Sequence, residues 1–230
     1  MIKIVCLLFI IIVAVVIGSM GINENHISKS PFELDEKGKL KIQEQCKFSG
    51  SGFGRDHELG ECSVALQIIP KVNNVLEIGG GAGKVSHMIN SILQERDLGK
   101  KHIVMEPGSS GKGNHGDVHL WKNKDTFKDQ YTILKKFACE LTMNDLEILD
   151  RKPDCLYTDC EGCLLEFCQS EIGDYVLDNV RYIVNEMDGF VKNNQIDKKL
   201  RQIWRNKGFE KVGVGYGCGT RCDTEIWMKI

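Results

Sequence analysis

Hydrophobic residues change their spacing repeatedly along the chain from about residue 61 onward. Short apolar runs of strand length, such as Asn74–Ile78 and His102–Pro107, are followed by stretches in which apolar residues recur every three to four positions. Between residues 84 and 96 the apolar positions fall on one face of a helix: Val85, Met88, Ile89, Ile92 and Leu93. Strands that alternate with helices predict a mostly parallel sheet covered on both faces.

The pattern predicts seven strands in an α/β, Rossmann-like domain. We expect strands at 74–78, 102–107, 131–139, 154–162, 180–188, 209–217 and 224–230. We expect helices at 61–69, 84–96, 117–126, 142–150, 163–177 and 197–208. Only a short turn separates the last two strands, so they must be antiparallel. In such folds the ligand lies at the carboxyl ends of the parallel strands.

The first residues form a different kind of segment. Ile4–Gly18 carries no charge and follows Lys3. Its length is close to the lower limit of about 17 residues for a membrane span, and it also suits a signal peptide. We predict that 1–21 is a single-pass anchor, with a cleaved signal and a buried element as alternatives. The positive charge of Lys3 then places the folded domain on the lumenal or extracellular side, or the protein is secreted.

The remaining chain divides by composition into a linker and one domain. Residues 22–45 are polar without periodicity and predict a stalk, whereas 46–230 is long enough for one globular domain. Within it, 46–73 begins with a glycine-rich stretch and predicts a lid. A formal net charge of −2 argues against a nucleic-acid partner, because phosphate binding leaves a basic surface.

Ten cysteines are many for a chain of this length. Beyond a membrane some of them would pair. Cys46 with Cys62 and Cys218 with Cys222 are candidate disulfides, because each pair closes a short glycine-rich segment. Sequence alone leaves the connectivity open.

The stretch NNVLEIGGGAGKVSHMIN, residues 73–90, predicts a strand, a glycine turn and a helix. A P-loop would need Gly at 78 and Ser or Thr at 85, where the chain has Ile and Val. A dinucleotide fingerprint would need Gly or Ala at 84, where the chain has Lys, which weakens that alternative. The pattern that fits is E-x-G-x-G-x-G, formed by Glu77, Gly79, Gly81 and Gly83.

This pattern resembles motif I of the class I S-adenosyl-L-methionine-dependent methyltransferases. Glycines let the backbone approach a ligand closely, and Glu77 would repel a diphosphate but attract the cofactor's ammonium group. Glu106, at the end of the second predicted strand, is placed to accept both ribose hydroxyls. The resemblance also implies that Cys139 and Glu140, after the third strand, touch the adenine.

The later sequence resembles the FkbM-type methyltransferases over about 74–230. The resemblance rests on Thr142–Leu146, on the D-x-E-G element Asp159–Gly162, and on the acidic end of the next strand at Glu186. Two features depart from that family: motif I reads E-I-G-G-G-A-G, and one cysteine lies within D-x-E-G while another directly follows it. The resemblance implies O-methylation of a glycan or a small hydroxylated acceptor.

Three carboxylates are the candidate catalytic residues. Asp159, at the end of the fourth strand, is placed to take the acceptor's proton or to contact substrate, cofactor or metal. Glu161 has an alternative structural role as a cap of the following helix. Together with Glu186 they could hold a divalent cation through oxygen ligands. The loop residues His57 and His115 are interpreted as surface positions rather than catalytic groups. Arg55 is a candidate to bind the cofactor carboxylate or an acidic sugar.

Other functions are compatible with single motifs. Cys160 and Cys163 form a C-x-x-C at a strand-to-helix junction, as in thioredoxin-type redox proteins, but no proline follows residue 153 to complete that site. With Cys218 and Cys222 the pair could instead bind structural zinc. A degenerate methyltransferase fold that only binds a partner, and an NAD-dependent oxidoreductase, also stay open, as does the oligomeric state.

Overall fold

In the computed structural model the described residues are 59–81, 83–107, 120, 131–160, 162–216 and 223–230. All of them lie in one compact unit. The predicted stalk at 22–45 and nearly all of the helix predicted at 117–126 lie outside them. Among the described helices, none combines the length and the apolar character needed to cross a bilayer. The apolar run 4–18 also lies outside the described residues.

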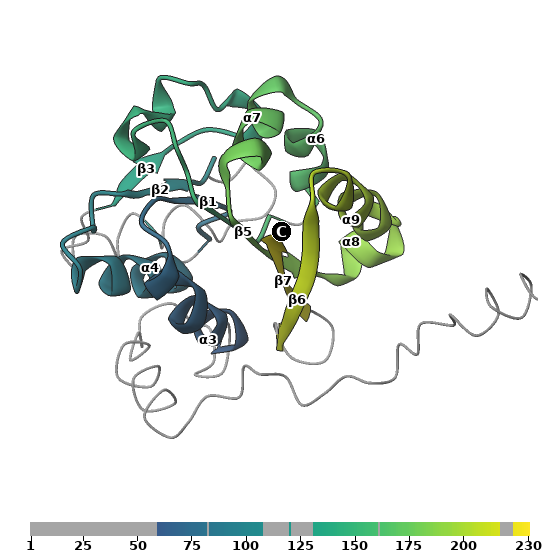
Figure 1. The fold of residues 1–230 in the computed structure, drawn as a ribbon, viewed down its shortest axis with the longest axis horizontal. Coiled ribbons are helices and arrows are strands. Elements are labelled where there is room, and N and C mark those ends of the chain that lie inside the picture. The colour runs from purple at the N-terminus through teal and green to yellow at the C-terminus, as the bar shows by residue number, and fades with distance from the viewer. Residues whose placement is uncertain (1–58, 82, 108–119, 121–130, 161, 217–222) are drawn as a thin grey trace, which may run out of the picture. The chain divides into compact units, whose positions relative to one another are not determined.

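Seven strands form one sheet in the order β3-β2-β1-β4-β5-β7-β6 (Figure 1). Strands β1 to β5 are parallel, and β7 is antiparallel to both β5 and β6. The strands are β1 (Val75–Ile78), β2 (His102–Met105), β3 (Thr132–Leu134), β4 (Cys155–Thr158), β5 (Tyr182–Met187), β6 (Phe209–Tyr216) and β7 (Asp223–Lys229). The predicted fold class, including the antiparallel final strands, is confirmed.

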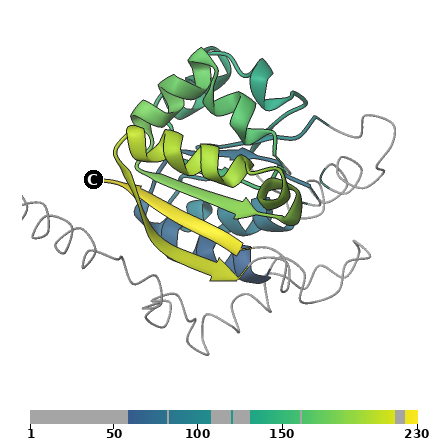
Figure 2. The same cartoon turned by 90° about the vertical axis from the view of Figure 1, so that its right-hand side faces the viewer.

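Helices cover both faces of this sheet (Figure 2). One face carries α3 (Leu59–Ile68) and α4 (Lys84–Gln94), and the other carries α6 (Leu164–Cys168), α7 (Glu171–Asn179) and α9 (Ile196–Asn206). The remaining elements are α8 (Gly189–Asn193) and three short 3-10 helices: η1 (Ile69–Lys71), η2 (Ala138–Glu140) and η3 (Asp145–Leu149).

Strict alternation along the buried strands separates two hydrophobic cores. In β1, Leu76 and Ile78 pack toward α6, α7 and α9, whereas Val75 packs toward α3 and α4. Successive side chains of a strand point to opposite faces, so Glu77 lies on the α3 and α4 side. Tyr157 of β4 lies in that same core. Polar residues at every second position near the strand ends therefore converge beneath α3 and α4.

Several predicted helix boundaries were wrong. The helix predicted at 163–177 is two helices, because the hydroxyl of Ser170 accepts a bond from the Gly173 amide and starts α7 anew. At 142–150 the structure has only η3, whose first residue, Asp145, accepts hydrogen bonds from the Thr142 amide and hydroxyl through its carboxylate. The helix α8 was not predicted, since its five residues are too short for a periodic signal.

Candidate functional site

The turn between β1 and α4 depends on glycine. Gly79, Gly81 and Gly83 have φ of 90°, 47° and 83°, a left-handed conformation that other residues adopt only at a cost. At Gly79 a Cβ atom would also overlap the backbone carbonyl of Asp159. The turn after β1 and the end of β4 are thus in backbone contact, which brings two predicted site segments together.

Glu106 fixes the middle of this turn. Its Oε2 accepts a hydrogen bond of 2.9 Å from the Gly81 amide. The side chain is partly exposed at the end of β2, so it lies beside the glycine turn as predicted. Its proposed contact with ribose hydroxyls stays a prediction.

Glu77 is held by two neighbours beneath the turn. Its Oε1 accepts a hydrogen bond of 2.7 Å from the Ser86 hydroxyl, and its Oε2 lies 2.7 Å from His102 Nε2. The Glu77 and His102 side chains are 2% and 0% exposed. Glu77 therefore has protein partners on both oxygens, and its predicted contact with the cofactor's ammonium group stays a prediction.

A group of three carboxylates lies at the carboxyl ends of β4 and β5. Oxygen atoms of Glu61, Asp159 and Glu186 all lie within 4.8 Å of one another. Tyr157 positions the first of them, because its hydroxyl donates a 2.7 Å bond to the Glu61 backbone carbonyl. Burial raises the pKa of Tyr157 well above its ordinary value, so the hydroxyl stays a donor.

Glu61 is the site residue that sequence reasoning missed. It is acidic in the first turn of α3, 2% exposed, and followed by an apolar helix. A carboxylate in the first turn of an apolar helix shortly before β1 was the available signal. Glu161, which was expected to complete the group, lies outside the described residues, as do Arg55, His57 and His115.

A pocket opens between the glycine turn and two of these carboxylates, Glu61 and Asp159. Its described lining residues are Glu61, Glu77, Gly79, Gly80, Gly81, Val85, Tyr157 and Asp159. Three of these lining residues, Glu61, Glu77 and Asp159, are carboxylates, and none is Lys or Arg. Carboxylates that line one pocket attract positive charge and repel negative charge, so the pocket favours a positively charged ligand or a cation over a diphosphate.

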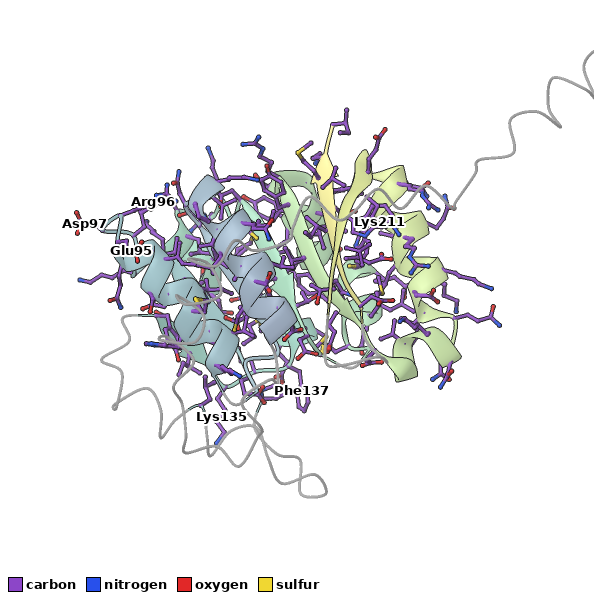
Figure 3. The ribbon with its side chains drawn as sticks, turned by 90° about the horizontal axis from the view of Figure 1, so that it is seen from below. Glu95, Arg96, Asp97, Lys135, Phe137 and Lys211 are labelled. Atoms are coloured by element: carbon purple, nitrogen blue, oxygen red, sulfur yellow. A yellow bond between two sulfur atoms is a disulfide. The ribbon has the colours of Figure 1, made fainter. Side chains whose placement is uncertain are left out.

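The predicted adenine-side residues lie on η2, after β3. Cys139 and Glu140 are both exposed, and the Glu140 carboxylate accepts a 2.8 Å bond from the Phe137 amide. Phe137 is 51% exposed and, with Lys135, projects outward from this segment, away from Glu95 to Asp97 beyond α4 (Figure 3). The exposure of Phe137 and Cys139 leaves both side chains accessible to a ligand. The contact of Cys139 with adenine stays a prediction.

Cys160 and Cys163 form a disulfide directly after Asp159. In this form neither sulfur is a thiolate, so the zinc site is not formed by this pair. The two predicted disulfides involve Cys46, Cys218 and Cys222, which lie outside the described residues.

Comparison with known proteins identifies the fold. No family model matches the chain, and no curated protein sequence matches it. Among solved structures, a proposed RNA methyltransferase of Pyrococcus horikoshii matches with a TM-score of 0.52 and 11% identity, over 86% of this chain and 98% of that one. A proposed tRNA methyltransferase of Streptococcus pneumoniae, in complex with S-adenosyl-L-methionine, matches with a TM-score of 0.50 and 14% identity, over 74% and 72%. The fold is that of the class I S-adenosylmethionine-dependent methyltransferases.

Within this methyltransferase fold, the glycine turn and the carboxylate group occupy the carboxyl edge of the parallel strands, where open α/β sheets bind their ligands.

Proposed function

We propose that the chain is an S-adenosylmethionine-dependent methyltransferase. The observation that carries the proposal is the pocket beside the glycine turn, which has three carboxylates and no basic side chain among its described lining residues. S-adenosylmethionine carries a sulfonium and an ammonium group, which this charge pattern attracts. An NAD-type ligand carries a diphosphate, which it repels, so the oxidoreductase alternative is disfavoured.

We further propose O-methylation of a glycan or small hydroxylated acceptor, as the FkbM resemblance implies. The acceptor oxygen attacks the methyl carbon, the carbon–sulfur bond breaks, and S-adenosylhomocysteine leaves. The hydroxyl proton passes to the Asp159 carboxylate. Holding the two reactants in line supplies most of the catalysis in such a displacement, and the carboxylate contributes the proton transfer.

A divalent cation is an optional part of this proposal. The described carboxylates that lie together are Glu61, Asp159 and Glu186, with Glu61 in addition to the residues expected from sequence. Carboxylate oxygens are ligands that Mg²⁺ and Ca²⁺ accept. A bound cation would lower the pKa of the acceptor hydroxyl and offset the repulsion among the three carboxylates.

Cofactor binding is the first test. We expect saturable S-adenosylmethionine binding in titration calorimetry, and weaker binding by about 1–3 kcal/mol for Glu106→Ala, the scale of hydrogen bonds to charged groups. Glu210→Ala, an exposed carboxylate on β6, should bind like the wild type. Absence of binding would favour the degenerate scaffold, and binding of NAD instead would favour the oxidoreductase.

The acceptor is tested by transfer of an isotopically labelled methyl group. We expect label in the glycan or small-molecule fraction of a membrane or secretory extract, read by mass spectrometry. Label confined to RNA would contradict both the proposed acceptor and the expectation that no nucleic acid is bound. The two neighbours described above are named for RNA substrates, so RNA belongs in the assay.

We also propose that the apolar run Ile4–Gly18 anchors the domain on the lumenal or extracellular side. The support is its lack of charge and the preceding Lys3. Release of the expressed full chain from membranes by alkaline carbonate without proteolytic processing would contradict an anchor.

A further inference from the structure

The polar residues beneath the glycine turn form a buried group of their own. Glu77, Ser86 and His102 come from β1, α4 and β2, and all three are at most 2% exposed. Sequence reasoning assigned Glu77 to the cofactor and gave Ser86 and His102 no role. Their geometry gives both a role at the site.

We propose that His102, together with Ser86, is a positioning residue that holds the Glu77 carboxylate and thereby sets the shape of the cofactor-binding turn. The inference rests on the proposed function and deepens it, because it says how the acidic residue of the E-x-G-x-G-x-G pattern is oriented. His102 itself does not line the pocket described above.

Strand register brings the imidazole to the carboxylate. Val75 pairs with His102 and Glu77 pairs with Val104, so these four residues share one face of the sheet. His102 thus lies beside Glu77 on the diagonal between neighbouring strands, with Nε2 2.7 Å from Oε2. The Tyr131 ring packs on the other side of the imidazole, with centroids 5.1 Å apart.

The surroundings of His102 determine which of its ring nitrogens carries the proton. Nδ1 is buried and has no hydrogen-bond partner among the described residues. A proton on that nitrogen would be a buried donor without an acceptor, which is costly. The favoured tautomer of His102 therefore carries its proton on Nε2 and donates a hydrogen bond to the Glu77 carboxylate.

The Glu77 carboxylate links the strand before the turn to the helix after it and to the neighbouring strand β2. On one side Glu77 is tied to β2 by His102. On the other side it is tied to the first turn of α4 by Ser86, whose hydroxyl lies 3.5 Å from where a Cβ of Gly80 would be. Without these donors Glu77 would be a buried charge without a hydrogen-bond partner, and its side chain would no longer be held in one orientation.

The test compares two replacements of His102 in two backgrounds. His102→Gln keeps an amide donor near the position of Nε2, whereas His102→Leu removes the donor. Each is made in the wild type and in Glu77→Gln, and S-adenosylmethionine binding is measured by calorimetry well below the thermal midpoint of each variant. We expect His102→Leu to raise Kd about tenfold or more, the scale of a lost bond to a charged group, and His102→Gln to raise it less than about threefold. In Glu77→Gln the two replacements should give similar Kd values, because the carboxylate they act through is gone.

Other outcomes overturn the inference. Equal losses for His102→Leu and His102→Gln would show a packing role, and independent effects in the Glu77→Gln background would show that His102 does not act through Glu77. If His102→Leu does not fold, Ser86→Ala takes its place, since alanine suits a helix; a wild-type Kd for that variant would count against the inference. Failure of the wild type to bind the cofactor would overturn the proposed function and this inference with it. That outcome is distinct from failure of the inference alone, because it is seen in the wild type before any residue is replaced.

Discussion

Replacing Gly79 with Ala should abolish cofactor binding and destabilise the domain. The residue has a φ of 90°, which costs a side chain about 1–2 kcal/mol. The new Cβ would also overlap the Asp159 carbonyl, and relieving such overpacking typically costs about 1–3 kcal/mol more. We expect the free energy of unfolding, measured with urea, to fall by about 2–5 kcal/mol.

Substitutions at two other glycines separate the cost of the left-handed backbone conformation from the cost of the steric overlap. Gly81 has a φ of 47° but open space around its Cβ position, so Gly81→Ala tests the backbone conformation alone. Gly189, in α8, has open space and no left-handed φ, so Gly189→Ala should leave stability unchanged or slightly raised. If Gly79→Ala behaves like Gly189→Ala, the close approach of the turn to β4 is not a constraint on the fold.

The order of strands and helices could be predicted because each buried strand is short, apolar and bounded by polar residues. β1, β4 and β5 are buried along their whole length, so their apolar runs stand out. The turn after β1 could also be predicted, because four glycines in the seven residues 77–83 mark a segment that needs unusual backbone conformations. Those two signals were enough for the fold and for the location of the pocket.

The residues that make up the site were harder to predict from the sequence, because they meet through contacts between segments that are distant along the chain. Glu61 approaches Asp159 and Glu186 only because α3 packs on the sheet, with the Tyr157 hydroxyl of β4 bonded to the Glu61 carbonyl. Likewise His102 looks like part of an ordinary strand until the register with β1 places it beside Glu77. Pairing of this kind has no local sequence signature.

Hydrogen bonds between side chain and backbone account for the wrong boundaries. Ser170 divides the predicted helix, and Asp145 bonds back to Thr142 where a full helix was expected. Both residue types compete with helical backbone bonds. Apolar periodicity continues through such positions, so a reading based on periodicity joins elements that the backbone separates.

Asp159→Asn should have the largest effect on activity. Asparagine keeps the shape of aspartate but cannot take the acceptor's proton, and loss of a positioned base typically lowers rates by about 10²–10⁴-fold. The fold should survive, because neutralising one of three carboxylates within 4.8 Å of one another relieves repulsion. The measurements are the initial rate of labelled methyl transfer and the thermal midpoint, with Glu210→Gln as the exposed control.

Glu61→Gln distinguishes a proton acceptor from a metal ligand. If Asp159 acts as the base, Glu61→Gln should retain most of the wild-type rate. Chelation of divalent cations should then leave the rates of both the wild type and Glu61→Gln unchanged. If the three carboxylates hold a cation, both variants should need a higher Mg²⁺ concentration for half-maximal rate, because each removes one charged oxygen ligand. A wild-type rate for Asp159→Asn at every Mg²⁺ concentration would exclude both roles and move the chemistry to another residue of the pocket.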